Sequence, residues 1–164
     1  MKTLSLLRHA KSAWKDQSCP DHDRRLNKRG KRDAPNIGLH LRSLALPIDF
    51  VLCSSAARAR ATADRALAAC HYQGPLLIEP RLYQATPVTM AAVVGESVPH
   101  DARSVRVIGH NPGLEEWLAL ITDSERPMPT GALAVVELRI DRWDTLTAAS
   151  SGELRHFHQP TKAP

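Results

Sequence analysis

The sequence predicts an α/β fold with three layers, in which helices cover both faces of a mostly parallel central sheet. Short apolar segments alternate along the chain with longer segments of helical character, and this alternation is typical of parallel sheets whose two faces are covered. The length of 164 residues suits one domain. We assign residues 1–158 to that domain and residues 159–164 to a loose C-terminal tail.

Six segments have the apolar character and the length of β-strands. The first begins almost at the N-terminus and ends immediately before Arg8 and His9. The predicted strands are residues 3–7, 49–53, 76–78, 105–108, 134–138 and 154–157.

Four helices are expected between these strands. Asn27 is a typical N-cap for a helix over residues 28–44, although Pro35 predicts a kink or a restart within it. Ser54 and Ser55 are expected to cap an Ala- and Arg-rich helix that ends near residue 69. Pro87 suits the first position of a helix that extends to residue 94, and a fourth helix is expected over residues 112–121.

The chain carries a formal net charge of +5, and its basic residues cluster between residues 24 and 32. Only seven residues are Phe, Trp or Tyr, and none interleaves with the basic run as a platform for stacking bases requires. We therefore expect no nucleic-acid partner. One interpretation of the basic run is a solvated helix face. We favour the other, in which it creates a positive electrostatic field around an anionic substrate.

Cysteine usage and hydropathy indicate a cytoplasmic location. Cys19, Cys53 and Cys70 show no paired spacing, and their odd number argues against a disulfide framework. No apolar run approaches the roughly 18 residues that a membrane helix needs. The apolar start of the chain is also too short for a signal peptide.

Three predicted strands are each followed by side chains that bind phosphate or titrate. Arg8 and His9 follow the first strand, Arg58 lies in residues 54–63 after the second, and His110 lies in residues 109–113 after the fourth. Parallel strands bring their carboxyl ends to one edge of the sheet, where ligands bind in open α/β folds. The sequence thus predicts one site built from three distant segments.

These three segments resemble the histidine phosphatase superfamily, and more narrowly its small phosphohistidine phosphatases of the SixA type. Residues 23–30 are similar to the Arg-Pro-Leu-Thr-x-x-Gly segment of that branch. The resemblance implies a phosphoglycerate mutase-like fold. It departs at two positions, because Ala10 stands where the superfamily usually has glycine, and Lys11 where many mutase-like relatives have Glu or Asn.

The resemblance also implies roles for individual residues. His9 is the nucleophile that becomes phosphorylated, Arg8 and Arg58 bind the phosphoryl oxygens, and His110 completes the pocket. Arg24 matches an arginine at the rim of the site in the small phosphatases, and with Asn111 it is assigned to substrate binding.

Phosphoryl transfer chiefly requires in-line positioning and stabilisation of charge on three oxygens. His9 has to present an unprotonated nitrogen, while a backbone carbonyl accepts from its other nitrogen, and nearby arginines disfavour its protonation. Residues 82–85 hold no carboxylate, so Asp21 or Asp23 is the possible general acid. The other histidines show no convergent partner. His156 and His158 alternate on one strand, but no third metal ligand is near in sequence.

The sequence therefore predicts a phosphatase that acts through a phosphohistidine intermediate, with no metal and no cofactor. The leading substrate is phosphohistidine on a protein, of the histidine-phosphotransfer type, and no membrane partner is expected. Two alternatives stay open. One is a phosphatase for small phosphomonoesters, and the other is a module that binds a phosphorylated ligand without turnover.

Overall fold

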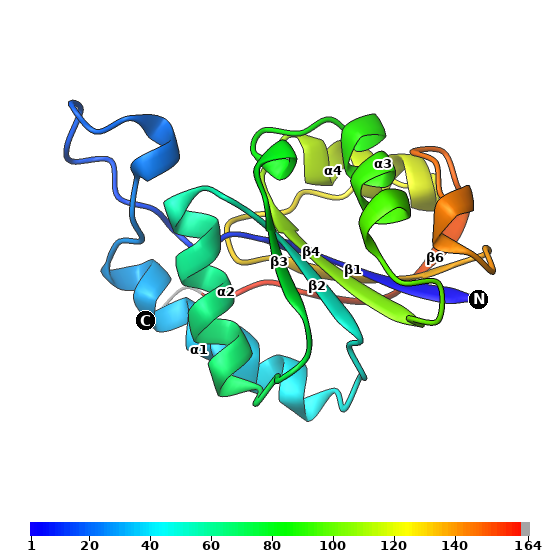
Figure 1. Cartoon of the computed structure of the whole chain (residues 1–164). Helices are drawn as coiled ribbons and strands as arrows, with labels where there is room; N and C mark the ends of the chain where they lie inside the picture. Colours follow the sequence, from blue (N-terminus) through cyan, green and yellow to red (C-terminus); the bar gives the residue numbers. More distant parts are fainter. Residues whose placement is uncertain (162–164) are drawn as a thin grey trace.

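The computed structural model describes residues 1–161, which contain one six-stranded sheet of order β3-β2-β4-β1-β5-β6. The strands are β1 (Lys2–Arg8), β2 (Phe50–Ser54), β3 (Leu76–Glu79), β4 (Ser104–Gly109), β5 (Leu133–Leu138) and β6 (Gly152–His158). Neighbours among β3, β2, β4 and β1 pair in parallel, whereas β5 is antiparallel to both β1 and β6. The mostly parallel sheet predicted from the sequence is confirmed (Figure 1).

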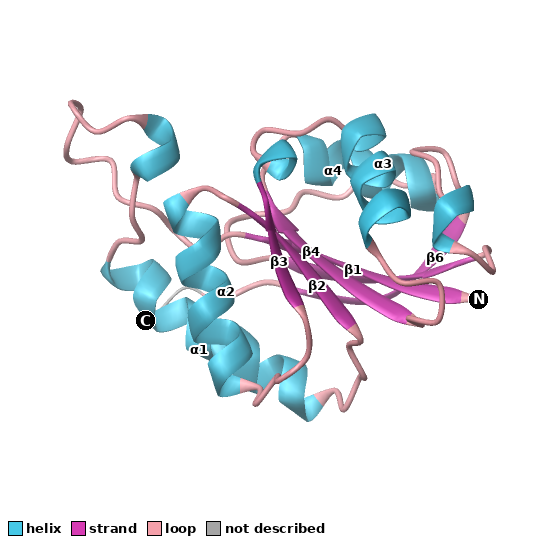
Figure 2. Ribbon diagram, in the orientation of Figure 1, coloured by secondary structure: helices cyan, strands magenta, loops and turns pink. Residues whose placement is uncertain are grey.

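Helices lie on both faces of this sheet, as the sequence predicts (Figure 2). The helices α1 (Lys28–Ser43) and α2 (Ala57–Ala69) pack together on one face, over a core that includes Val51 and Ile108. The helices α3 (Pro87–Ser97) and α4 (Gly113–Thr122) cover the other face, over a core that includes Leu6 and Val107. Burying the sheet on both faces fixes the carboxyl ends of its central strands in place.

The predicted helix boundaries hold in part. The Asn27 side chain accepts a hydrogen bond from the Gly30 amide at 2.9 Å and caps α1 as expected. Helix α1 passes through Pro35 without a restart, and α3 extends three residues beyond the predicted end, to Ser97.

The predicted serine cap of α2 is wrong. The N-cap is Ala56, which makes no side-chain cap hydrogen bond. Ser54 belongs to β2, where its hydroxyl accepts from the Ala56 amide at 3.2 Å and also contacts His110. The serine is therefore part of the candidate site as well as of the turn into the helix.

Between β1 and α1 the chain forms an arm that stands away from the sheet and includes the short 3-10 helix η1 (Asp21–Asp23) (Figure 1). Backbone pairing holds the base of the arm, because Ser12 bridges Leu26 and the Ala13 amide donates to the Arg25 carbonyl at 2.8 Å. The arm is thus anchored beside the carboxyl end of β1.

No helix within residues 1–161 is long and apolar enough to cross a membrane. Residues 159–161, the described part of the predicted tail, lie in neither helix nor strand, and residues 162–164 lie outside the described residues.

Candidate active site

The sheet brings three distant parts of the sequence together, as the spacing of the motifs predicts. β1 and β4 are neighbours, with Arg8 opposite Gly109, so that His9 and His110 follow adjacent strand ends. Their ring centroids lie 5.2 Å apart. Arg58, on the first turn of α2, donates from Nε to His9 Nε2 at 3.3 Å. These three side chains form the centre of the candidate site.

The orientation of His9 is fixed by the backbone. Its Nδ1 lies 2.8 Å from the Ala10 carbonyl oxygen, which can only accept, so Nδ1 carries the proton and Nε2 offers a lone pair. The Ala10 amide donates to the Thr62 hydroxyl at 2.9 Å, and that hydroxyl donates to the Arg58 carbonyl at 2.7 Å. Thr62 thereby couples the loop after His9 to the helix that carries Arg58.

Ala10, where the superfamily usually has glycine, is fully buried. It is not among the described residues that have a positive φ. The loop after His9 consequently needs no glycine, and the alanine methyl group instead packs with Leu26 and Ala34.

Both central histidines are neutral at pH 7. Burial, together with the positive charges of Arg58 and Arg8, lowers the pKa of His9 to about 3, although the hydrogen bond to the Ala10 carbonyl acts in the opposite direction. Burial, followed by the charge of Arg58, lowers the pKa of His110 to about 4. His9 Nε2 is therefore unprotonated near neutral pH, as a nucleophile requires.

These shifts predict a loss of stability in acid. In the unfolded chain a histidine binds a proton near pH 6.5, whereas His9 and His110 bind one in the folded protein only near pH 3 to 4. Stability is thus lost as the pH falls below about 6.5, by up to about 1.4 kcal/mol per pH unit for each histidine. We expect the free energy of unfolding in urea to be about 2 kcal/mol or more lower at pH 5 than at pH 7. His9→Asn is expected to reduce this difference, and equal stability at the two pH values would contradict the assignment.

Arg58 is almost completely buried, with 4% of its surface exposed. Besides its contact with His9, it donates to the Asp21 carbonyl at 2.7 Å and to Asp21 Oδ2 at 3.0 Å. Arg60, two residues further along α2, is exposed to solvent. Only one of these two arginines faces the site, as a helix requires for positions two apart.

Arg8 and Asn111 lie on one side of the site and share a backbone acceptor. Arg8 donates to the Met128 carbonyl at 3.0 Å, and the Asn111 amide nitrogen donates to the same oxygen at 2.9 Å. The Gly131 amide donates to the His9 carbonyl at 2.9 Å, which places this segment against the loop after β1. Arg8 Nε, His110 Nδ1 and Asn111 Oδ1 are buried atoms without a hydrogen-bond partner in residues 1–161.

The two possible general acids, Asp21 and Asp23, lie in different surroundings. Asp21 belongs to the site: its carboxylate accepts from the Tyr83 hydroxyl, from Arg58, and from Arg24 Nε at 3.0 Å. The Tyr83 hydroxyl, with Arg58 and Arg24 adding to it, holds the pKa of Asp21 well below its usual range. Asp23 is exposed, and its carboxylate pairs with the His22 ring at 3.4 Å.

Arg24 is buried, but it makes no hydrogen bond to His9. Its Nε binds Asp21, and its Nη1 donates to the Ser12 hydroxyl at 2.6 Å. Arg24 is thus joined to Arg58 through the Asp21 carboxylate that both of them bind.

Sequence reasoning missed an aromatic wall formed by Tyr83 and His22. The Tyr83 ring stands edge-on to His110, with 5.5 Å between the centroids, and edge-on to His22 at 4.8 Å. His22 also lies 2.9 Å from the Ser55 hydroxyl, so the prediction that it has no convergent partner is wrong. Tyr83 lies in a short irregular segment, where no periodic pattern marks a tyrosine as part of a site.

The same prediction is wrong for three histidines far from the site. His40 of α1 lies 2.8 Å from His156, Nε2 to Nε2, and its ring stacks on His158 with 3.8 Å between the centroids. Helix α1 therefore places a third histidine beside His156 and His158 of β6, although no third metal ligand is near them in sequence. As the rings stand, no three His, Cys, Asp or Glu side chains in residues 1–161 are arranged to hold a metal ion.

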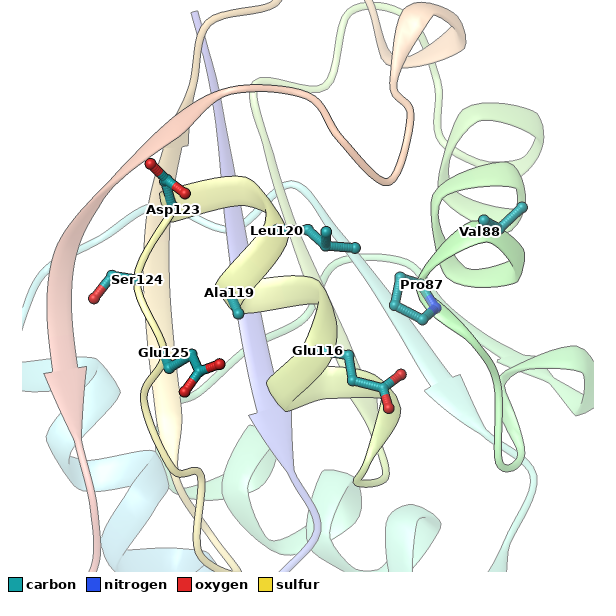
Figure 3. Close-up of a pocket in the computed structure, with 8 residues that line it drawn as sticks. All are labelled: Pro87, Val88, Glu116, Ala119, Leu120, Asp123, Ser124 and Glu125. Atoms are coloured by element: carbon teal, nitrogen blue, oxygen red, sulfur yellow. The ribbon is translucent and has the colours of Figure 1, made fainter.

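A cavity of about 600 Å³ lies elsewhere, between α3 and α4. Pro87 and Val88 face Leu120 across it, and Glu116 and Glu125 bring carboxylates to its wall (Figure 3). It contains none of the candidate site residues, and its negative charge disfavours a phosphoryl group.

The sequence profile of the histidine phosphatase superfamily (branch 1) matches residues 4–85, which is half of the chain. The chain belongs to the histidine phosphatase superfamily. His9, Arg8 and Arg58 lie within the matched segment, whereas His110 lies beyond it.

Relatives of this histidine phosphatase extend the match to nearly the whole chain. An uncharacterised protein of Mycobacterium leprae is 32% identical over 167 residues, covering 94% of this chain and 99% of that protein. A structure from Nakamurella multipartitia, assigned as the phosphohistidine phosphatase SixA, is 31% identical with a TM-score of 0.81, covering 98% of this chain and 97% of the other. A structure from Agrobacterium tumefaciens with the same assignment is 27% identical with a TM-score of 0.82, covering 97% and 98%. The fold is phosphoglycerate mutase-like, and the protein is a phosphatase.

Proposed function

We propose that this phosphatase removes the phosphoryl group from phosphohistidine on a protein, through a phosphorylated His9 and without a metal. The observation that carries the proposal is the environment of the Asp21 carboxylate. A carboxylate held ionised beside Arg58 is unable to donate a proton, but it is well suited to accept one in a hydrogen bond. The imidazole that leaves a phosphohistidine carries an N–H group, which needs a hydrogen-bond acceptor rather than a proton donor.

The first step transfers the phosphoryl group between two imidazoles. The lone pair of His9 Nε2 forms a bond to phosphorus, while the bond from phosphorus to the ring nitrogen of the substrate breaks and its electron pair stays on that nitrogen. The substrate reacts in the form that is protonated on its other ring nitrogen, and because that proton remains there, the leaving group is neutral imidazole. The Asp21 carboxylate, with 39% of its side chain exposed, is placed to accept a hydrogen bond from that N–H.

Arginines stabilise the transferred group. Arg58 and Arg8 supply the positive charge for its equatorial oxygens, and His110 and Asn111 provide further polar groups at the pocket wall. In the second step, water attacks the phosphorus of phospho-His9, the P–N electron pair returns to Nε2, and inorganic phosphate leaves with the protons of the water. The Ala10 carbonyl holds the proton on His9 Nδ1 in both steps.

Asp21→Asn tests the substrate class. We expect kcat/KM for N-phosphoimidazole to fall about tenfold or more, because the N–H acceptor loses its charge. The value for glycerol 2-phosphate is expected to stay equal or rise, since a carboxylate that competes for Arg58 has been neutralised. If glycerol 2-phosphate suffers the larger loss, Asp21 is a general acid and small phosphomonoesters become the favoured substrates. Binding of both compounds without turnover would support the non-catalytic module.

Metal independence is tested by chelation. Activity is expected to be unchanged after exhaustive treatment with EDTA, because the arginines supply the charge that a metal ion would bring. Vanadate, which mimics five-coordinate phosphorus, is expected to inhibit strongly. Activity that disappears with EDTA and returns with a divalent ion would refute this part of the proposal.

We also propose a cytoplasmic location, as the cysteine usage indicates. Cys19, Cys53 and Cys70 are all free thiols.

A further inference from the structure

The net charge of the protein is concentrated in one segment. Residues 11–32, which we call the basic arm, contain eight Lys and Arg against three Asp, an excess of five. The formal net charge of the whole chain is also +5, so the remaining residues balance. The basic arm comprises the loop after His9, η1 and the first turns of α1.

Most of this charge does not serve the catalytic centre. Lys15, Arg25, Lys28 and Lys31 are exposed, and none of them forms an ion pair with any residue in 1–161. Of the arm's cations, only Arg24 is bound to a residue of the site, through Asp21. A small phosphorylated molecule held at His9 would leave the exposed cations without a partner.

The arm also presents an exposed tryptophan. Trp14 has 67% of its surface exposed, and the guanidinium of Arg24 lies 3.6 Å from its ring centroid. Tryptophan and arginine are the residue types most enriched in the contacts that dominate a protein interface. Since Arg24 binds Asp21 and Asp21 binds Arg58, this contact is only two side chains away from the arginine that touches the nucleophile.

The arm holds this surface in a defined place. The Ser12–Leu26 bridge joins its two sides, and the Asn27 amide donates to the Lys11 carbonyl at 3.0 Å. The arm is therefore an anchored structure that stands away from the sheet, beside the carboxyl end of β1 (Figure 1). A partner bound to it would have its own surface close to His9.

We propose that the basic arm docks onto an acidic face of the protein that carries the phosphorylated histidine, with Trp14 as the central contact. Charge complementarity favours an acidic protein, and it speeds encounter more than it strengthens the bound state. This inference deepens the proposed function and rests on it, because it names the surface that selects a protein substrate over a small one.

The test compares two synthetic phosphohistidine peptides of equal length, one flanked by glutamates and the other by glutamines. We expect the wild-type protein to turn over the glutamate peptide with a kcat/KM about tenfold or more higher at low salt, and this preference to shrink as salt is added. In an arm variant with Lys15, Arg25, Lys28 and Lys31 changed to Gln, the preference is expected to fall below about threefold. Trp14→Ala is expected to lower kcat/KM for both peptides about tenfold.

Two controls separate docking from catalysis and from general charge. A matched variant replaces four exposed arginines outside the arm that also lack ion pairs within residues 1–161; they are Arg42, Arg65, Arg103 and Arg139, each changed to Gln. It is expected to keep the preference for the glutamate peptide. Turnover of N-phosphoimidazole is expected to be the same in the arm variant and the wild type, because none of the four changed residues contacts the site.

Each other outcome has one meaning. Equal kcat/KM for the two peptides in the wild type, with N-phosphoimidazole hydrolysed, overturns the docking proposal and leaves the proposed function standing. An equal loss of preference in the matched variant also overturns it. A single-stranded RNA that binds the wild type but not the arm variant, with no peptide preference, would assign the arm to nucleic acid instead. If the wild type hydrolyses neither of the peptides nor N-phosphoimidazole, the proposed function itself is refuted.

Discussion

His9→Ala is expected to abolish turnover of every phosphoryl donor, with a loss of at least about a thousandfold in kcat. His9 Nε2 is the atom that accepts the phosphoryl group in the proposed mechanism, and it is held by the Ala10 carbonyl behind it and Arg58 Nε beside it. The His110 ring lies beside it, with 5.2 Å between the ring centroids, but its Nε2 faces the Ser54 hydroxyl at 2.7 Å. The loss is expected in the chemical step and therefore in kcat rather than in KM.

The measurement is acid-labile incorporation of labelled phosphate, by rapid quench, together with steady-state rates. Wild type is expected to trap label on His9, whereas His9→Ala traps none. His9 is buried, with only 5% of its surface exposed, so its removal also affects packing. His9→Gln is therefore a necessary second variant, since it fills the space without supplying the nucleophile. Exposed His100, changed to Ala, is the matched control, and activity of His9→Ala within tenfold of wild type would exclude the covalent mechanism.

The general layout could be predicted because it depends on local patterns. Apolar segments such as residues 49–53 and 105–108 identify strands, and parallel strands necessarily bring their carboxyl ends to one edge. That rule alone is enough to place Arg8, His9 and His110 together at this edge of the sheet.

The parts that could not be predicted depend on loops and on distant contacts. Asp21 and Asp23 are equivalent in sequence, and only the fold of η1 turns one toward Arg58 and the other toward solvent. Tyr83 reaches Asp21 across 62 positions, and His40 meets His156 across 116. Neither contact has a periodic signature, because irregular segments and elements from opposite ends of the chain are placed by tertiary packing.

The second large effect is expected from Arg58→Ala, on the order of a hundredfold or more in rate, whereas Arg60→Ala is expected to cost less than about 1 kcal/mol. The two arginines lie on the same turn of α2 and carry the same charge, which makes them a matched pair. Arg58 is buried with its guanidinium on His9 and Asp21, but Arg60 is exposed. Long-range charge is removed equally by both changes, so a difference between them reports direct contact with the phosphoryl group.

Arg58→Lys refines the interpretation of this pair. An ammonium retains the charge, but it lacks the planar fork with which Arg58 contacts His9 and Asp21 at once. We therefore expect Arg58→Lys to recover only a minor part of the lost rate. Rates for all three variants should be measured with N-phosphoimidazole as the common donor, alongside thermal unfolding, because removing Arg58 leaves Asp21 with less compensation for its charge. If Arg60→Ala is the more damaging change, the other side of α2 faces the phosphoryl group, and Arg58 then serves to hold Asp21 rather than the substrate.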